Sequence, residues 1–205
     1  WFDLAEFPAA PDAPRIEFPA NGMELRTYKI PVKDLRETYK WEEIVEAAKK
    51  IEPTAITKAE TLSWEVPEEG EDAHFLIWHG PLVQERDGAM RIGVSGRTTA
   101  IMFDGRLVLA PGDGGRTTDV FVKRGIHKLT VFSIAMPKEK SVEVLRARPN
   151  PNAAEVKMLP FTASDFQVVE GLPEIDKAET SEITGEENRW ILKTAAREIR
   201  HIDFE

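Results

Sequence analysis

From residue 55 to about residue 159, hydrophobic and polar positions alternate with a period of two, as they do in half-buried β-strands. The apolar runs are short and β-type: HFLIW, MRIGV, TAIMF, RLVLA, DVFVK, HKLTVFSIA, SVEVLRA and EVKMLP. Glycine-containing turn signals separate them, among them Gly80-Pro81, Asp87-Gly88, Ser95-Gly96, Asp104-Gly105 and Arg124-Gly125. Turn signals at this spacing predict a mainly β fold, an antiparallel β-sandwich or barrel.

The sharpest local signal is the stretch TTAIMFDGRLVLA, residues 98–110. Two apolar runs flank Asp104-Gly105, and an Asp-Gly pair tolerates the positive φ angles that a two-residue hairpin turn requires. This stretch predicts a tight hairpin in which the Asp104 side chain supports the turn by hydrogen-bonding its own backbone.

Before this region the apolar period changes to 3.6. One stripe within residues 37–51 holds Trp41, Ile44, Val45, Ala48 and Ile51. Acidic residues come early and lysines late, as the helix macrodipole favours, and a proline follows two residues after the stripe. We predict an amphipathic helix over about residues 37–51 that docks on the sheet. A helix that fits a partner's groove is the alternative.

These patterns divide the chain into three parts. Residues 1–54 form an N-terminal extension, with loop-like or extended packing besides the helix, and residues 55–160 form the β domain. Residues 161–205 form an acidic loop followed by strands that pack on the same body; RWILKTAAREIRHIDFE fits two short strands or a strand and a helical turn. Because the chain begins at Trp1 and ends on a strand-like segment, we expect a piece of a longer protein.

Composition narrows the function. The net charge of −9 and the scattered basic residues argue against binding to nucleic acid or to an anionic membrane surface. The 205 residues contain no cysteine, which excludes disulfides, thiolate metal sites and a cysteine nucleophile. No apolar run approaches the roughly 20 residues that span a bilayer, so we expect no membrane insertion.

Catalytic motifs are missing from the sequence. It contains no HExxH or His-x-x-x-His spacing for zinc and no G-x-S-x-G elbow for a serine nucleophile. His74 and His79 are five apart on a strand and so point to opposite faces. His127 fits a structural imidazole that ties down a neighbouring loop. We predict no catalytic residue, no metal and no cofactor, with a glycan hydrolase built on a carboxylate pair as the weaker alternative.

Four residues are candidates for ligand contacts: Arg97, Asp104, Asp113 and Asp119. Asp113 and Asp119 lie in the segment APGDGGRTTD and offer oxygen ligands. The alternative is that this segment is an ordinary long hairpin loop without a ligand. Arg97 can hydrogen-bond a sugar or a carboxylate. Trp64, Trp78 and Trp190 can stack on sugar rings, but a large aromatic residue in an alternating strand is more often core, and we predict that Trp78 is buried.

The order of these motifs resembles the PA14 domain family. The resemblance runs roughly from Thr61 to Leu145, and the matching residues are Phe75, Ile77, Trp78, Gly80, Leu82, Gly88, Arg91, Ile92, Asp104, Gly105, Leu107, Val108, Gly125, His127, Leu129 and Val131. It implies a twisted β-sandwich or barrel and a non-catalytic module, usually of secreted, periplasmic or surface proteins. Several branches of the family bind carbohydrates.

One loop departs from the family. In the sugar-binding branches, two successive aspartates before the Asp-Gly hairpin hold a calcium ion that ligates sugar hydroxyls. The matching loop here, Val94 to Thr98, contains no carboxylate. Calcium requires six to eight oxygen ligands, several of them charged. We therefore do not expect the calcium-dependent mode of sugar binding.

The sequence as a whole predicts a non-catalytic binding or accessory module of a larger secreted or cell-envelope protein. Its partner is a protein or a glycan, and its place is extracellular, periplasmic or at the cell surface. The alternative is a structural or assembly subunit of a surface or multiprotein complex. In that case the chain forms homo- or hetero-oligomers, for example by adding a strand to a neighbour's sheet.

Overall fold

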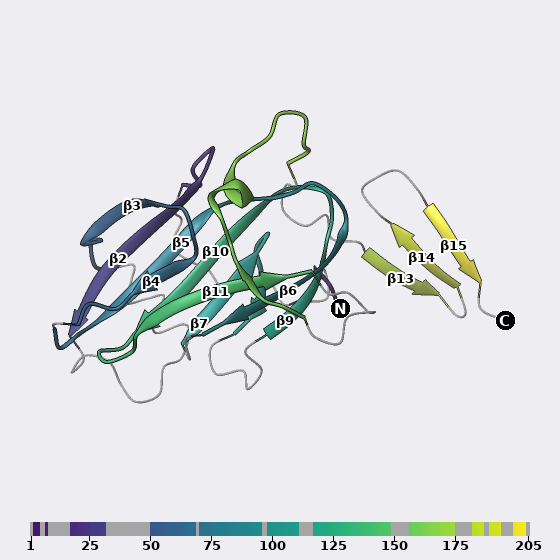
Figure 1. Cartoon of the computed structure of the whole chain (residues 1–205). Coiled ribbons are helices and arrows are strands. Elements are labelled where there is room, and N and C mark those ends of the chain that lie inside the picture. Colours follow the sequence, from purple (N-terminus) through teal and green to yellow (C-terminus); the bar gives the residue numbers. More distant parts are fainter. Residues whose placement is uncertain are drawn as a thin grey trace.

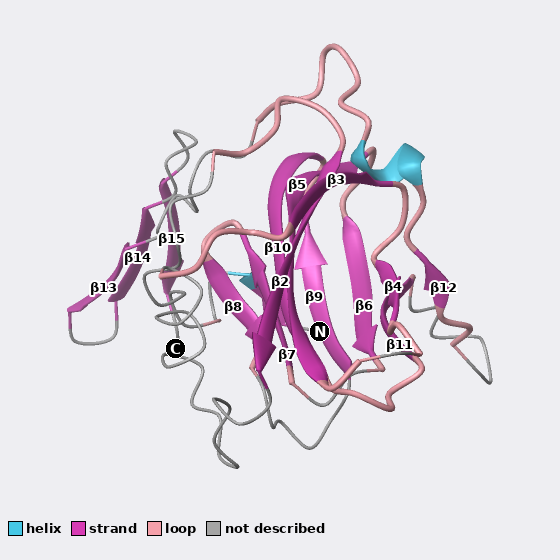
Figure 2. Ribbon diagram, turned by 90° about the vertical axis from the view of Figure 1, so that its left-hand side faces the viewer, coloured by secondary structure: helices cyan, strands magenta, loops and turns pink. Residues whose placement is uncertain are grey.

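The structure is a computed structural model that describes residues 2–4, 7, 17–31, 50–68, 70–95, 98–110, 117–148, 156–174, 182–186, 189–193 and 199–203. Two six-stranded sheets form the two layers of a sandwich (Figures 1 and 2). The described residues contain no α-helix. This architecture confirms the predicted antiparallel β-sandwich.

Sheet I runs in the order β1 (Phe2–Asp3), β9 (Thr117–Val122), β6 (Gly88–Val94), β11 (Ser141–Ala147) and β12 (Leu159–Pro160), and β4 (Ser63–Glu65) also pairs with β11. Sheet II runs in the order β3 (Ala55–Ala59), β2 (Met23–Pro31), β5 (Asp72–Gln84), β10 (Gly125–Ala135), β7 (Thr99–Phe103) and β8 (Arg106–Leu109). All pairs are antiparallel except β1 with β9.

A third, three-stranded antiparallel sheet consists of β13 (Glu182–Glu186), β14 (Arg189–Lys193) and β15 (Ile199–Asp203). The segment that was ambiguous in the sequence therefore forms two short strands. That these strands pack on the body of the domain stays a prediction.

The main core lies between the two sheets. Trp78 is its largest fully buried side chain, at 0% exposure, which confirms the prediction for this residue. Strand β5 contributes Leu76, Trp78 and Leu82 to this core, and sheet I contributes residues such as Ile92 and Val120. Burying one aliphatic or aromatic side chain of this kind contributes about 1.5–3 kcal/mol, so the packing of the two facing sheets stabilises the fold.

Sheet II is buried on its outer face as well. A second cluster there includes Phe75, Ile77 and Phe132, so every residue of β5 from Ala73 to Gln84 is buried. A strand buried on both faces is apolar without interruption, which is why the sequence FLIW shows no alternation. His74 lies on the core side with Leu76, and His79 lies on the outer side with Phe75, as predicted.

The Asp104-Gly105 turn is confirmed. Both residues have positive φ, 47° and 75°, and Phe103 pairs with Arg106 across the hairpin of β7 and β8. These are the backbone angles that the two-residue hairpin turn demands.

The Gly80-Pro81 turn prediction is wrong. Both residues lie inside β5, where Gly80 pairs with Leu129. A Cβ at Gly80 would stand 2.5 Å from the carbonyl oxygen of Gly22. The glycine therefore permits a close approach of two backbones, a tertiary contact that the local sequence pattern does not reveal.

Part of the N-terminal extension belongs to sheet II. Residues 23–31 form β2, which pairs with both β3 and β5, so this segment is extended and shares a sheet with the β domain. The helix predicted at 37–51 falls outside the described residues, apart from Lys50 and Ile51. Those two residues lie in a turn and a bend, so the structure gives this helix no support.

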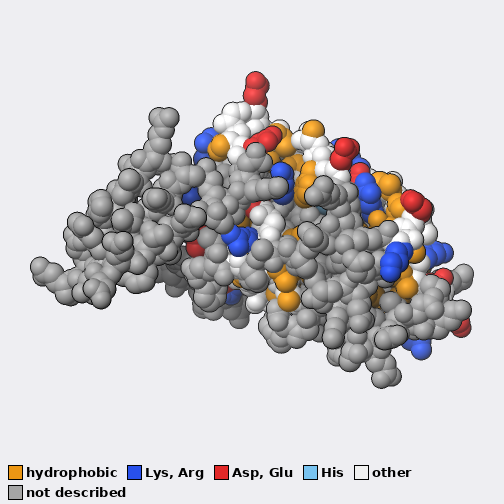
Figure 3. Space-filling view, turned by 180° about the vertical axis from the view of Figure 1, so that it is seen from behind, with side chains coloured by type: hydrophobic (Ala, Val, Ile, Leu, Met, Phe, Trp, Pro, Cys, Tyr) orange, Lys and Arg blue, Asp and Glu red, His pale blue; other side chains and the backbone are white. Residues whose placement is uncertain are grey.

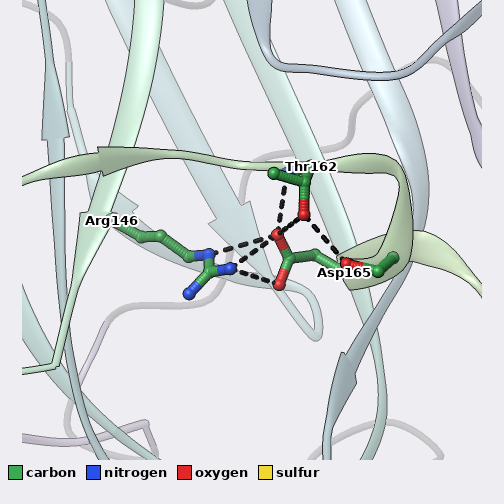
Figure 4. A network of polar contacts seen from close by, with 4 residues as sticks. Arg146, Thr162 and Asp165 are labelled. Atoms are coloured by element: carbon green, nitrogen blue, oxygen red, sulfur yellow. Dashed lines mark hydrogen bonds and ion pairs between the residues drawn. The ribbon is translucent and has the colours of Figure 1, made fainter.

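The chain after β11 is fastened to sheet I by an ion pair (Figure 4). Arg146 in β11 donates to both carboxylate oxygens of Asp165, at 2.5 Å and 2.7 Å from Nη2. Asp165 lies in the short 3₁₀ helix η3 (Ala163–Phe166) and also accepts the Thr162 N–H at 2.7 Å. The Arg146 guanidinium lies 5.5 Å from the centre of the Phe161 ring. This contact holds Phe161 and Phe166, both 0% exposed, in the core.

We predict that Arg146→Ala lowers the free energy of unfolding by about 1.5–3 kcal/mol, because it removes a forked, charge-assisted contact and the stacking on Phe161. Urea unfolding followed by tryptophan fluorescence measures the change. Arg148→Ala, at an exposed position nearby, is the control and should change stability by less than about 0.5 kcal/mol. Equal effects of the two substitutions would contradict the role given to Arg146.

Candidate functional site

Asp119, one sequence candidate, is engaged inside sheet I. Its carboxylate accepts two hydrogen bonds from Arg91 on the neighbouring strand β6, at 2.6 Å and 2.7 Å. The hydrogen bond from Arg91 is the main cause that lowers the pKa of Asp119. The two residues are direct register partners in β9 and β6, so this carboxylate stabilises a strand pair.

Asp104, a second candidate, is buried and bonded to the start of β10. One carboxylate oxygen accepts the Lys128 N–H at 2.7 Å, and the other lies 2.5 Å from Nδ1 of His127. Nε2 of His127 lies 2.8 Å from the Lys123 carbonyl oxygen, so Nε2 carries a proton and donates. The carboxylate thus bonds to β10 rather than to its own turn, and His127 ties down the hairpin as predicted.

The remaining candidates, Arg97 and Asp113, lie outside the described residues. The described ends of the first loop are held firmly. Ser95 exchanges hydrogen bonds with the backbone of Glu143 in β11, and the Thr98 carbonyl accepts the Ile134 N–H. Among the residues that the structure describes, no group of three His, Asp or Glu side chains is placed to hold a metal ion.

A groove of about 1120 Å³ lies at the end of the sandwich where the β4–β5 loop meets the β10–β11 hairpin. This end is at the lower left of Figure 1. The groove is lined by residues 63–68, 70–72, 137–141 and 143; we call it the end groove. The Val66 N–H donates to the Lys140 carbonyl at 3.0 Å, which joins the two walls. Two smaller hollows, about 170 Å³ and 210 Å³, border Phe18 elsewhere.

Trp64 is the aromatic residue of the end groove. It is half-buried in β4, opposite Val142 of β11, and packs against the main core. Its ring lies 4.8 Å from the ring of His74, centre to centre. Burial is the largest cause that lowers the pKa of His74, and Lys29 lowers it further. The indole therefore rests on an uncharged imidazole at neutral pH, and its remaining surface is available to a ligand in the groove.

Acidic side chains dominate the rim of the end groove. Glu65, Glu68 and Glu71 come from the β4–β5 segment, and all three are exposed. Glu143 faces them from β11, and Ser63 and Ser141 add hydroxyl groups. Sequence reasoning missed this site because its walls are about 70 residues apart in the chain. The acidic run EVPEEGED was the only signal in the sequence.

Seen from behind, acidic, basic and apolar side chains of the described residues lie interspersed (Figure 3). No helix among the described residues has the length and apolar character needed to cross a bilayer.

The two histidines of β5 should make stability depend on pH. Burial is the largest cause that lowers the pKa of His79, as it does for His74, despite the hydrogen bond from Nε2 to Glu24. Both folded-state pKa values lie below the unfolded value of 6.5, so the unfolded chain binds more protons. Their contribution to stability is present above pH 6.5 and is lost as the pH falls below it.

We therefore expect the free energy of unfolding to fall between pH 7.5 and 5.5, by at most about 1.4 kcal/mol per pH unit for each histidine. Urea unfolding at several pH values measures the slope. His79→Gln should make the slope shallower, because it removes one titrating group. A variant with an unchanged slope would show that His79 does not carry this effect.

Comparisons with known proteins show which solved structures share this fold. No protein-family model matches the sequence, and no curated protein matches it. Among solved structures, the PA14 domain of the antifreeze protein MpAFP is similar with a TM-score of 0.52 and 10% identity, covering 74% of this chain and 97% of that one. The PA14 sugar-binding domain of an RTX adhesin gives a TM-score of 0.53 and 10% identity, with 73% and 99% covered.

The epithelial adhesin 9 A domain from Candida glabrata, in complex with Galβ1-4GlcNAc, is similar with a TM-score of 0.51 and 12% identity, covering 77% and 97% of the two chains. Identities this low establish the fold alone. The predicted PA14-like fold is confirmed.

Proposed function

We propose that this PA14-like chain is a non-catalytic binding module that holds a carbohydrate in the end groove. The observation that carries the proposal is the half-buried indole of Trp64, set in a groove of about 1120 Å³ between carboxylates and hydroxyls. Ligand pockets for small molecules usually measure about 300–1,000 Å³, so this groove has room for a short oligosaccharide.

The groups in the groove suit sugars. The apolar C–H face of a pyranose ring packs on an indole face, and carboxylate oxygens accept hydrogen bonds from sugar hydroxyls. Two structural neighbours support this choice, because one is described as a sugar-binding domain and another was solved with Galβ1-4GlcNAc. We expect binding without calcium, since the loop from Val94 to Thr98 carries no carboxylate.

The setting of the module is part of the same proposal. We place the chain in a larger secreted or cell-envelope protein, at an extracellular, periplasmic or cell-surface location, where it would serve as an accessory to other domains. The PA14-like fold and the adhesin domains among its neighbours support this setting.

The proposal predicts that Trp64→Ala weakens glycan binding about fivefold to a hundredfold, because removal of an aromatic residue that stacks on a nucleic-acid base costs about 1–3 kcal/mol and we expect a similar loss for a sugar ring. A glycan array identifies the ligand, and calorimetry with EDTA present measures the affinity. Val169→Ala, which truncates an exposed apolar residue outside the groove, is the control. Trp64→Phe, which keeps an aromatic ring, should retain part of the affinity and the fold.

A chain that binds no oligosaccharide on the array, although it is folded by circular dichroism, would remove the carbohydrate proposal. Binding that Trp64→Ala leaves unchanged would remove the end groove as its site.

A second function, assembly through a sheet edge, is favoured by β3. This strand is the edge of sheet II, four of its five residues are exposed, and Ile56 is 53% exposed. Unpaired edge strands accept a strand from another chain. For this alternative we expect light scattering to detect dimers at high concentration, and Ile56→Lys to disperse them. A monomer at every concentration would count against it.

A further inference from the structure

The end groove carries an excess of negative charge. Six carboxylates line it, namely Glu65, Glu68, Glu71, Asp72, Glu139 and Glu143, whereas only Lys138 and Lys140 are basic. Both lysines lie on the β10–β11 hairpin, while four of the acids lie on the facing β4–β5 segment. One wall of the groove is thus purely acidic in its ionisable side chains within the described residues.

The exposed acids of this wall differ from the buried and partly buried acids of the domain. Asp104, Asp119 and Asp165 are each paired with a histidine or an arginine. Glu65, Glu68 and Glu71, by contrast, form no ion pair or side-chain hydrogen bond in the described part of the chain. The internal carboxylates are thus paired, whereas the exposed carboxylates of Glu65, Glu68 and Glu71 are accessible to a ligand. On the opposite wall, Glu139 accepts the Met136 N–H at 2.9 Å.

From this contrast we propose that the end groove prefers a positively charged glycan, an oligosaccharide of amino sugars whose free amines are protonated. The inference rests on the carbohydrate site proposed above and names its ligand class. An ammonium group is attracted by the carboxylates, and the attraction grows as the bound ligand displaces water from the groove. The face of Trp64 attracts a cation as well as a sugar ring. A neutral glycan gains only the stacking, and an acidic glycan is repelled.

The site itself does not depend on the acids. The concave shape and the half-buried indole, resting on the ring of His74, mark the groove as a ligand site, and the carboxylates determine which charge it accepts. A glycan rather than a lysine-rich peptide is the expected ligand because the exposed part of a flat indole can pack on the apolar C–H face of a pyranose ring.

A matched pair of ligands tests the charge preference. Chitosan pentamer and chitin pentamer share one backbone and differ in whether the amine is free or acetylated. We expect calorimetry at pH 6 and low salt to show at least tenfold tighter binding of the chitosan oligomer, and added sodium chloride to reduce this preference. The chitin oligomer should show little dependence on salt.

Charge variants locate the effect. Glu65→Gln, Glu68→Gln and Glu71→Gln together keep the shapes of the side chains and should remove the preference for the chitosan oligomer while leaving chitin binding in place. The matched control, Glu52→Gln, Glu85→Gln and Glu170→Gln, removes the same net charge at exposed positions outside the groove. It should leave the preference unchanged.

The outcomes are distinguishable. Equal affinity for the two pentamers overturns the charge preference and leaves the carbohydrate site standing, as does a preference that both triple variants abolish equally. No binding of either pentamer or of any other glycan overturns the proposed function and the inference with it. Tighter binding of a lysine pentapeptide than of the chitosan pentamer overturns the choice of a glycan.

Discussion

The pairing of β5 with β10 is the constraint on which the rest of the structure depends. The two strands pair without interruption from Gly125 opposite Gln84 to Ala135 opposite His74. Antiparallel pairing over this length brings the segment before β5 to the same end as the hairpin after β10. The two walls of the end groove meet because of this register, and a shift by one residue would also exchange the core face of β5 for its outer face.

Burial determines which carboxylates of the domain need a partner. The buried carboxylate of Asp104 is bonded to His127, and the partly buried carboxylate of Asp119 is bonded to Arg91. Leaving such a group unpaired would cost the full desolvation of a charge. At the end groove the exposed carboxylates can be hydrated by solvent. They therefore need no partner within the protein and can bind a ligand that displaces the water.

The sequence predicts well whatever is encoded locally. The Asp104-Gly105 turn and most strands between β5 and β11 follow from residue periodicity and positive-φ chemistry. Gly80 was misassigned because its reason, the approach of the Gly22 backbone, is a contact between distant segments. The end groove was missed for the same cause, since only the strand register brings residues 63–72 beside residues 137–143. Asp119 looked available because its partner Arg91 lies on another strand.

The loop from Val94 to Thr98 and the end groove are physically connected, because Ser95 and Glu143 bond backbone to backbone and through the Ser95 hydroxyl. In the sugar-binding branches of the PA14 family, which the sequence resembles as a whole, the corresponding loop carries two acids that hold a cation, and the cation holds the sugar. Here the loop has no acid, whereas the adjoining groove has six carboxylates. Under the proposed function, a ligand that brings its own positive charge takes the electrostatic place of the metal ion, so affinity should depend on salt and on ligand amines rather than on calcium.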